Sequence, residues 1–310
     1  MRALVTGGAG FIGSHVVDAL AGRGDEVLVI DDMSSGREEN LDRARAHGVR
    51  LLEADITDRG IVAAAFADHR PELVCHLAAQ IDVRRSVADP GFDLGINVGG
   101  TINLLDAARE HGTSRFVFTS TGGAIYGEGA DRELPFDETA ECRPDAPYGQ
   151  SKFAAEGYVA LYGRLCGLSG ISLRLGNIYG PRQDPHGEAG VVAIFCTALR
   201  EGRRPSVFGD GMQTRDYVYV GDVVEAFVAA AGSDATGAYN IGTGVETSVL
   251  DLGERLARSF DREFDPEMAP PRPGEVQRIS ISSALARERL GWSAATELDR
   301  GVELTADSFR

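Results

Sequence analysis

The sequence lacks the features that mark secreted, membrane and metal-binding proteins. No apolar run approaches the roughly 18 residues of a membrane-spanning helix, and the first residues lead into a short apolar segment and glycines, unlike a secretory signal. The six histidines form no ligand motif with one another or with the cysteines, so we expect no metal site. The cysteines have no paired spacing, which predicts free thiols in a reducing cytoplasm; they are Cys75, Cys142, Cys166 and Cys196.

Positive charge is also scarce. The chain has 31 Lys and Arg residues against 47 Asp and Glu, which gives a formal net charge of -16. Nucleic acids and acidic membrane surfaces are bound through basic patches, so this balance argues against both as partners. An anionic small molecule would have to be met by a few local arginines.

What the chain does contain is a regular alternation of short apolar segments and amphipathic stretches in its first half. Strand-like segments occupy Ala3–Thr6, Glu26–Ile30, Arg50–Glu53, Leu73–His76, Arg115–Thr119 and Ile171–Leu175. Helical patterns lie between them, at Phe11–Gly22, Ile61–Ala67, Asn97–Glu110 and Ser151–Leu165. Strands that alternate with such helices predict an α/β protein with a Rossmann-type, doubly wound parallel sheet.

The pattern changes after Asn177, where prolines interrupt shorter elements. We therefore divide the chain into a sheet domain of residues 1–175 and a smaller, loop-rich lobe of residues 176–310 that would carry substrate contacts. A segment near 213–238 is expected to return to the main sheet, with a strand at Asp216–Val220 and a helix at Asp222–Ala231.

A glycine motif follows the first strand directly and opens a helix. Gly7, Gly10 and Gly13 would let the backbone turn tightly and approach a pyrophosphate, although such a run also fits a plain glycine-rich turn. Asp31 closes the second strand about 20 residues later, where a carboxylate accepts the ribose hydroxyls of NAD. The same carboxylate would repel the 2′-phosphate of NADP, so the two features together predict NAD as cofactor.

Two more segments that follow strands are candidates for cofactor contacts. Asp55 and Ile56 could flank the adenine, but Asp55 as a helix N-cap explains the pattern equally well. After the fourth strand, Leu77-Ala-Ala79 is small enough to let the backbone approach the cofactor. His76, at the end of that strand, fits a packed histidine better than a ligand.

Tyr148 and Lys152 stand four residues apart, so they would share one face of a helix. A nearby cation lowers the pKa of a tyrosine and makes it a usable proton acceptor. The fifth strand runs into the hydroxyls of Ser120 and Thr121, at the edge where doubly wound sheets bind ligands. A surface helix pair and a simple turn are the structural alternatives, but the order of all these segments favours a catalytic site.

These motifs together resemble those of the extended short-chain dehydrogenases/reductases, and most of all the UDP-glucose 4-epimerases. The matching segments run from Thr6 to Arg272-Pro-Gly-Glu275. The resemblance implies NAD held tightly through turnover, a UDP-sugar substrate, a homodimer, and a catalytic hydroxyl at Thr121, with Ser120 as the alternative. It also implies cofactor contacts at Phe11, Ile12, Asp32, Ser34, Ser35, Gly36, Asn97 and Thr119.

The resemblance further assigns substrate contacts in the second lobe. Arg215 and Arg272 match two diphosphate contacts, for which the planar guanidinium is well suited, although solvated salt bridges are the alternative in so acidic a chain. Glu275 matches an acid that accepts the hydroxyls of the uridine ribose. The remaining expected contacts are Asn177, Val191, Val192, Phe208 and Tyr217.

The same resemblance limits the reactions that we expect this chain to catalyse. Related 4,6-dehydratases carry an acid pair beside the threonine of the fifth strand, whereas here no carboxylate follows Thr121 until Glu128. We therefore expect interconversion of UDP-glucose and UDP-galactose through transient oxidation at C4. The alternatives are a UDP-glucuronate or UDP-N-acetylglucosamine 4-epimerase, another nucleotide-sugar enzyme such as a dehydratase or reductase, or a non-catalytic NAD-binding protein. In the resembling epimerases a tyrosine lines the sugar pocket at the position of Ile279 and excludes N-acetyl sugars, so the smaller Ile279 predicts some tolerance for UDP-N-acetylglucosamine. Arg278 beside it, if it points inward, could accept a glucuronate carboxylate.

Overall fold

The protein is described by a computed structural model of residues 1–185, 190–272 and 274–310. Its largest unit is a seven-stranded sheet in the order β11-β6-β5-β4-β1-β2-β3, with every neighbouring pair parallel. This confirms the expected Rossmann-type sheet, whose strand order reverses between β1 and β4. The strands are β1 (Arg2–Thr6), β2 (Glu26–Asp31), β3 (Arg50–Glu53), β4 (Leu73–His76), β5 (Arg115–Thr121), β6 (Ser169–Leu175) and β11 (Gly237–Ile241).

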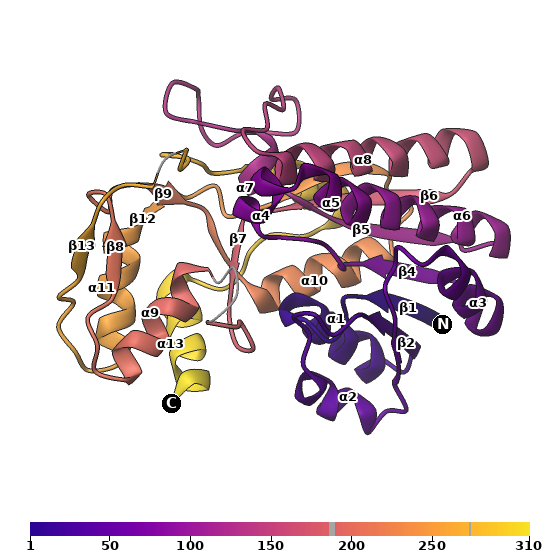
Figure 1. The fold of residues 1–310 in the computed structure, drawn as a ribbon, viewed down its shortest axis with the longest axis horizontal. Helices are drawn as coiled ribbons and strands as arrows, with labels where there is room; N and C mark the ends of the chain where they lie inside the picture. The colour runs from indigo at the N-terminus through magenta and orange to yellow at the C-terminus, as the bar shows by residue number, and fades with distance from the viewer. Residues whose placement is uncertain (186–189, 273) are drawn as a thin grey trace.

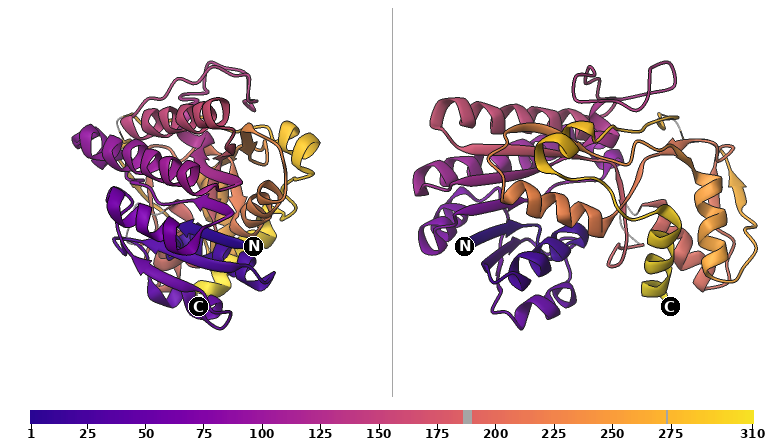
Figure 2. Two further views of the ribbon diagram at one scale, coloured as in Figure 1. Left: turned by 90° about the vertical axis from the view of Figure 1, so that its right-hand side faces the viewer. Right: turned by 180° about the vertical axis from the view of Figure 1, so that it is seen from behind.

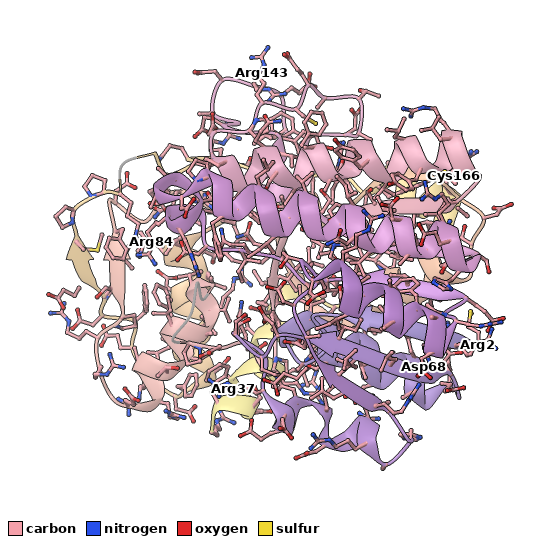
Figure 3. All side chains as sticks on the ribbon, turned by 45° about the vertical axis from the view of Figure 1, so that its right-hand side comes forward. Arg2, Arg37, Asp68, Arg84, Arg143 and Cys166 are labelled. Carbon is pink, nitrogen blue, oxygen red and sulfur yellow. The ribbon has the colours of Figure 1, made fainter. Side chains whose placement is uncertain are left out.

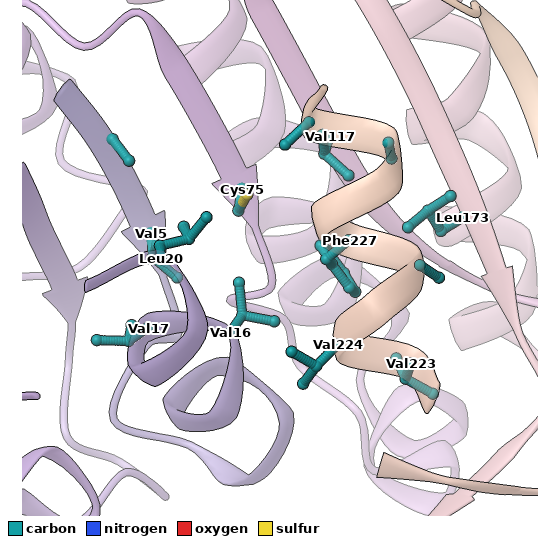
Figure 4. Close-up of a cluster of buried hydrophobic side chains, with 14 of the residues drawn as sticks. Val5, Val16, Val17, Leu20, Cys75, Val117, Leu173, Val223, Val224 and Phe227 are labelled. Carbon is teal, nitrogen blue, oxygen red and sulfur yellow. The ribbon is translucent and has the colours of Figure 1, made fainter. Parts of the chain in front are cut away.

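Helices cover both faces of the sheet (Figure 1), which is why the inner residues of strands such as β1 and β2 are continuously apolar. Helices α1 (Phe11–Gly22) and α10 (Val220–Ala231) pack on one face, and α3 (Arg59–His69), α6 (Thr101–His111) and α8 (Pro147–Cys166) pack on the other. Figure 4 shows the core on the first face, where the two helices meet the strands through Val16, Val17, Leu20, Val223, Val224, Phe227, Val5, Val117 and Leu173.

Shorter helical segments lie in the connections, several of them at the carboxyl edge of the sheet. Between α4 and α6 the chain includes a π-helical turn, a feature that is frequent at functional sites. The segments are η1 (Glu38–Leu41), α2 (Asp42–Arg45), α4 (Val83–Ala88), α5 (Pro90–Leu94), the π-helical η2 (Gly95–Gly100) and α7 (Gly122–Ile125).

A smaller lobe lies beyond the carboxyl ends of the strands, as the views in Figures 1 and 2 agree. Its core contains Phe195, Leu252, Leu256 and Val302, contributed by three helices. The helices are α9 (Val191–Arg200), α11 (Val249–Ser259) and α13 (Leu298–Phe309), while α12 (Ala284–Leu290) packs back against β11 and α10. Two short strand pairs complete the lobe: β8 (Ser206–Phe208) with β13 (Glu267–Ala269), and β9 (Thr214–Arg215) with β12 (Thr247–Ser248).

The strand expected at Asp216–Val220 does not join the main sheet, so that prediction is wrong. The observed β10 (Tyr217–Tyr219) pairs only with β7 (Asn177–Tyr179) and forms a separate parallel ribbon. The strand that does return is β11, which pairs with β6 along its whole length. Its sequence, Gly-Ala-Tyr-Asn-Ile, contains glycine and asparagine, which are depleted in strands, so local pattern did not reveal it.

Within the described ranges, no helix is long and apolar enough to cross a membrane. No group of three or more His, Cys, Asp or Glu residues could hold a metal ion there. The four cysteines carry free thiols, as expected from their spacing.

Candidate active site

The glycine loop after β1 is packed so closely that side chains are excluded at two positions. Gly7 has φ +68°, and a Cβ atom on it would lie 2.6 Å from the backbone nitrogen of Ala78. A Cβ on Gly13 would collide with the carbonyl oxygen of Gly7. Gly10 caps α1, whose first residues, Phe11 and Ile12, are half-exposed. The loop therefore presents the backbone N–H groups of a helix N-terminus without side chains in front of them, which suits a phosphate.

Asp31 lies at the carboxyl end of β2 and supports this loop. Its Oδ2 accepts a hydrogen bond from the backbone N–H of Ala9 at 2.9 Å, and its Oδ1 accepts one from Met33 at 3.0 Å. Burial raises the pKa of the carboxyl group, and these two hydrogen bonds act in the opposite direction. Each carboxylate oxygen can accept more than one hydrogen bond, so acceptor capacity remains for ribose hydroxyls. Gly36 packs directly against this carboxylate, because a Cβ atom placed on it would lie 2.7 Å from Asp31 Oδ1.

The loop after β2 is exposed and internally hydrogen-bonded. Asp32 Oδ1 accepts from the backbone N–H of Ser34 at 2.9 Å and from its hydroxyl at 2.6 Å. Ser35 is exposed and Gly36 half-exposed. Arg37, labelled in Figure 3, pairs with Asp184 of the segment that leads into the smaller lobe, at 3.0 Å.

The segments after β3 and β4 divide into exposed and packed residues. Asp55 is exposed and accepts from the backbone N–H of Thr57 at 2.8 Å, whereas the N-cap of α3 is Asp58, so the N-cap alternative for Asp55 is wrong. Ile56 is buried in the core between sheet and helices. The segment Leu77-Ala78-Ala79 is half-exposed and lies beside the glycine loop, where the strand order reverses.

His76 is a packed histidine, as expected. Its Nδ1 lies 2.7 Å from Thr6 Oγ1 and its Nε2 lies 2.9 Å from Thr101 Oγ1. Burial lowers its pKa well below the ordinary value, with a smaller effect of the Lys152 charge. It is therefore neutral and bridges two threonines.

Helix α8 begins at Pro147, four residues earlier than the sequence pattern indicated, so its first turns carry both Tyr148 and Lys152. The backbone N–H of Tyr148 donates to Ser86 Oγ at 3.1 Å. Lys152 is 2% exposed, and its Nζ lies 4.4 Å from the centroid of the Phe118 ring on β5. It is also the only lysine in the sequence, a signal that pattern analysis did not use.

Burial has the largest effect on the pKa of both Tyr148 and Lys152. It raises the pKa of Tyr148 to about 12, while a side-chain hydrogen bond with Thr121 lowers this pKa and the Asp93 charge raises it. Burial lowers the pKa of Lys152 to about 7, against the charges of Glu156 and Asp93, which raise it. We expected Lys152 to lower the pKa of Tyr148, but in this structure that pKa is raised, and desolvation of the phenolate is the main cause.

The three hydroxyls at the end of β5 lie in different surroundings. Thr121 is the hydrogen-bond partner of the Tyr148 side chain. Ser120 is 2% exposed and pairs in register with Arg174 of β6. In the part of the chain that the structure describes, Ser120 Oγ and Thr119 Oγ1 are buried without a hydrogen-bond partner. Of the two alternatives for the hydroxyl beside Tyr148, the geometry favours Thr121.

Asn97 lies in the π-helical η2 and is fully engaged inside the protein. Its Oδ1 accepts from the backbone N–H of Gln80 at 2.9 Å. Its Nδ2 lies within hydrogen-bond distance of the Gln80 carbonyl, of Asp93 Oδ1 and of Ser151 Oγ, at 3.0, 3.1 and 3.0 Å. Asn97 thus connects the segment after β4 with α8.

Asn177, at the start of β7, faces the same space as Thr121. A Cβ atom on Gly123 would lie 3.4 Å from Asn177 Oδ1 and 3.9 Å from Thr121 Oγ1. The small residue between them leaves both polar side chains facing the space beside Gly123. Asn177 is also held by its backbone, which donates to the Asp216 carbonyl at 2.7 Å.

The polar residues expected in the smaller lobe come together as two pairs. Arg215 is partly buried, and its Nη2 lies 3.5 Å from Glu275 Oε1. Arg272 is exposed and stacks on Phe208, with its Cζ atom 3.8 Å from the ring centroid. Pro273, which falls inside the Arg-Pro-Gly-Glu sequence, lies outside the described residues.

Several side chains expected near the substrate are instead part of the lobe core. Val192 and Tyr217 are buried, and Val191 packs against the same cluster. Ile279 is buried with Tyr126 and other residues in a separate small cluster. Sequence spacing alone does not distinguish a residue whose side chain faces a pocket from one whose side chain faces the core.

Arg278 does not point inward, so the expectation that it could receive a glucuronate carboxylate is wrong. Its Nε and Nη2 bind the two carboxylate oxygens of Glu246 at 2.9 and 2.5 Å. Glu128, the first carboxylate after the fifth strand, accepts from the backbone N–H groups of Gln277 and Arg278. Glu128 and Arg278 therefore stabilise the loops around them.

Sequence analysis missed two acidic residues near Lys152. Glu156 follows it by one helical turn and binds Arg174 of β6 through both carboxylate oxygens, with Nη2 to Oε2 at 2.7 Å. The spacing to Lys152 was a usable signal for Glu156. Asp93 lies on α5, a helix that only the tertiary structure brings against α8. No local pattern could have identified it.

Known proteins are similar to this chain in sequence and fold over its whole length. A model of the NAD dependent epimerase/dehydratase family matches residues 3–242. The UDP-glucose 4-epimerase of Mycolicibacterium smegmatis is 46% identical over 312 residues, covering 100% of this chain and 99% of that protein. The structure of UDP-glucose 4-epimerase with UDP-glucose from Thermotoga maritima has a TM-score of 0.96 at 44% identity, covering 100% and 98% of the two chains. The UDP-glucose 4-epimerase of Thermus thermophilus, in complex with NAD, gives 0.92 at 45% identity, with 100% and 99% covered. The chain belongs to the NAD-dependent epimerase/dehydratase family.

Proposed function

We propose that the protein is an NAD-dependent UDP-glucose 4-epimerase, which interconverts UDP-glucose and UDP-galactose. The observation that carries the proposal is the hydrogen bond between Tyr148 and Thr121 at the carboxyl edge of the sheet, with the buried Lys152 one turn along α8. The whole-chain similarity to proteins named UDP-glucose 4-epimerase supports the same substrate.

The residues around the glycine loop fit the cofactor. Gly7 and Gly13 leave no room for side chains where a pyrophosphate would lie, and Asp31 retains acceptor capacity for a ribose. Thr119 Oγ1, buried without a partner among the described residues, supports a polar contact at the same edge. Bound by this loop and Asp31, NAD would supply the hydride acceptor for sugar C4 and a positive charge.

Tyr148 is the proposed base that removes the proton of the sugar 4-hydroxyl. A phenol with a pKa of about 12 is protonated at neutral pH, so it needs neighbouring positive charge and hydrogen-bond donors before it can serve. Lys152, when protonated, supplies one such charge from the same helix face, and Thr121 orients the phenol and the sugar oxygen. After the hydride is returned to the opposite face of the sugar, Tyr148 gives the proton back.

The smaller lobe is proposed to hold the UDP group. Arg215 and Arg272 supply guanidinium groups for the diphosphate, Glu275 accepts from the uridine ribose, and Asn177 contacts the substrate beside Thr121. In this division of labour residues 1–175, with the return segment near 213–238, bind NAD, and residues 176–310 bind the nucleotide sugar. The Arg215–Glu275 pair would hold these two side chains in place for a substrate.

We also propose a homodimer located in the cytoplasm. The free thiols of all four cysteines support a reducing compartment. Large apolar side chains exposed along α8 support a contact between subunits; they are Phe153, Tyr158 and Leu165. Size-exclusion chromatography with light scattering tests the dimer.

Purified protein incubated with UDP-glucose, without added NAD, is expected to form UDP-galactose. UDP-N-acetylglucosamine and UDP-glucuronate serve as competing substrates in parallel reactions, and Tyr148→Phe is the inactive control. Formation of a 4-keto-6-deoxy sugar, or no turnover of any of the three with NAD present, would refute the proposal.

A further inference from the structure

A buried carboxylate lies behind the helix that carries Tyr148 and Lys152. Asp93 of α5 is 1% exposed. Its Oδ1 accepts from Gln80 Nε2 at 2.9 Å and from Asn97 Nδ2 at 3.1 Å. Its Oδ2 is buried without a hydrogen-bond partner among the described residues. A buried carboxylate oxygen is costly unless a cation or donor balances it, so this atom needs an explanation.

The same cluster is tied to α8 by hydrogen bonds. Asn97 Nδ2 lies 3.0 Å from Ser151 Oγ, and Ser151 donates to the carbonyl of Tyr148 at 3.0 Å. Ser151 directly precedes Lys152, and α5 packs against α8. Asp93 therefore sets, through the Asn97 amide, the turn of α8 that presents both Tyr148 and Lys152.

Lys152 carries the opposite charge and is also buried. It is 2% exposed, and its charged head lies over the Phe118 ring. Two anions raise its pKa against burial, Glu156 of its own helix and Asp93 of α5. Tyr148 precedes Lys152 by one turn of the same helix, and Arg174 on β6 binds Glu156. His76 on β4, whose pKa the Lys152 charge lowers, is held neutral by burial. The other helices and strands packed against α8 carry Arg85 on α4, Asp106 and Arg109 on α6, and Arg115 on β5.

The two anions differ in how far their charge is already balanced. Glu156 binds the Arg174 guanidinium through three hydrogen bonds of 2.7 to 3.2 Å. Asp93 has amide donors but no guanidinium or ammonium partner among its hydrogen bonds in the described chain. Lys152 lies on the turn of α8 that Asp93 reaches through Asn97 and Ser151, so it is a cation whose charge the buried Oδ2 can balance.

We propose that Asp93 is the counter-charge and positioning residue of Lys152. One carboxylate oxygen orients the Asn97 amide and hence the first turns of α8, and the other keeps the buried ammonium protonated. The inference rests on the proposed function, because it assigns Lys152 the task of supporting proton removal by Tyr148. Asp93 touches neither sugar nor cofactor and acts through its two neighbours.

The identity of Lys152 as the only lysine in the chain makes the proposal directly measurable. In protein produced with isotope-labelled lysine, the single side-chain signal in an NMR titration reports Lys152 alone. Asp93→Asn keeps an oxygen for the two amide donors but removes the charge. The midpoint of the Lys152 titration is expected to fall by about one pH unit or more in this variant.

Asp222→Asn is the matched control, because Asp222 is a buried carboxylate of α10 that accepts hydrogen bonds from the backbone and hydroxyl of Thr296. Its loss is expected to destabilise the fold without moving the Lys152 midpoint. The pH profile of turnover gives a second readout: its alkaline limb is expected to move to lower pH in Asp93→Asn only. An unchanged Lys152 midpoint in Asp93→Asn overturns the proposal.

A second variant tests the proposal if Asp93→Asn does not fold. In that case adding Lys152→Met, which removes the unbalanced ammonium, is expected to restore folding, and failure to restore it overturns the pairing. The titration needs no turnover, so a shifted midpoint in a protein inactive toward all UDP-sugars would support the pairing and refute only the proposed function.

Discussion

The side chains of Tyr148 and Thr121 are hydrogen-bonded to each other, although one opens α8 and the other ends β5. The contact forms because both elements meet at the carboxyl edge of the sheet, beside the point where the strand order reverses. It brings a phenol and a hydroxyl together at this edge, with a buried lysine on the next turn. The first predictions follow from this pair.

Tyr148→Phe is expected to lower turnover by about 100- to 10,000-fold, the usual contribution of a general base. Folding and bound NAD should be unchanged, because the ring is retained and only the hydroxyl is lost. Steady-state kinetics with UDP-galactose, together with thermal unfolding, measure both effects. Near-normal turnover would remove Tyr148 from the mechanism.

Thr121→Val and Ser120→Ala should separate the two hydroxyls at the end of β5. Loss of the Thr121 hydrogen bond is expected to reduce turnover by about 10- to 100-fold, as for a bond worth one to three kcal/mol. Ser120→Ala should change turnover less than about threefold, since no partner of the Ser120 hydroxyl is present among the described residues. The reverse ranking would make Ser120 the working hydroxyl.

NAD should be preferred to NADP because a 2′-phosphate would face the Asp31 carboxylate. Arg37 could offset this repulsion, but it is paired with Asp184 at 3.0 Å. Cofactor content after refolding with equal amounts of NAD and NADP measures the preference. Equal uptake would contradict the prediction, and Arg37→Ala, which should otherwise leave uptake unchanged, would then identify Arg37 as the cause.

Lys152→Met is expected to alter how stability depends on pH. The pKa of Lys152 falls from 10.5 to about 7 on folding, so between these values the unfolded chain binds more protons than the folded one. Stability of the natural protein therefore rises with pH across this window, with a contribution of up to about 1.4 kcal/mol per pH unit from this group. The raised pKa of Tyr148 opposes the trend only above about pH 10.

The variant should be more stable than the natural protein near neutral pH, and the difference should shrink as pH rises. Denaturant unfolding at several pH values below about 9.5 measures it. A difference that does not depend on pH would mean that Lys152 is not titrating in this window.

Arg278→Ala should leave the choice among UDP-sugars unchanged, because Arg278 is bound to Glu246. An exposed pair of this kind contributes at most about 1 kcal/mol to stability, so only a small loss of stability is expected. The ratio of kcat/KM for UDP-glucose and UDP-glucuronate tests this. A large shift in that ratio would mean that Arg278 reaches the sugar.

Much of the site could be predicted from local pattern. The glycine loop, Asp31 and the Tyr148/Lys152 spacing are determined by short-range rules: a tight turn before a helix, a charge at a strand end, and two residues on one helix face. Each rule holds whatever the rest of the chain does. For the same reason apolar runs located six of the seven strands of the main sheet, and the weakly patterned β11 was missed.

The sequence by itself therefore determined the fold class, the cofactor motif and the Tyr148/Lys152 pair on one helix face. Only the tertiary structure decided which hydroxyl contacts Tyr148 and that Arg278 forms an ion pair with Glu246. It also decided that the side chains of Val192 and Tyr217 face the core. It also decided the protonation chemistry, because burial sets the pKa of Tyr148 and Lys152 and places Asp93 behind them. Desolvation and contacts between distant segments depend on how the elements pack, and the spacing of residues along the chain carries no record of that.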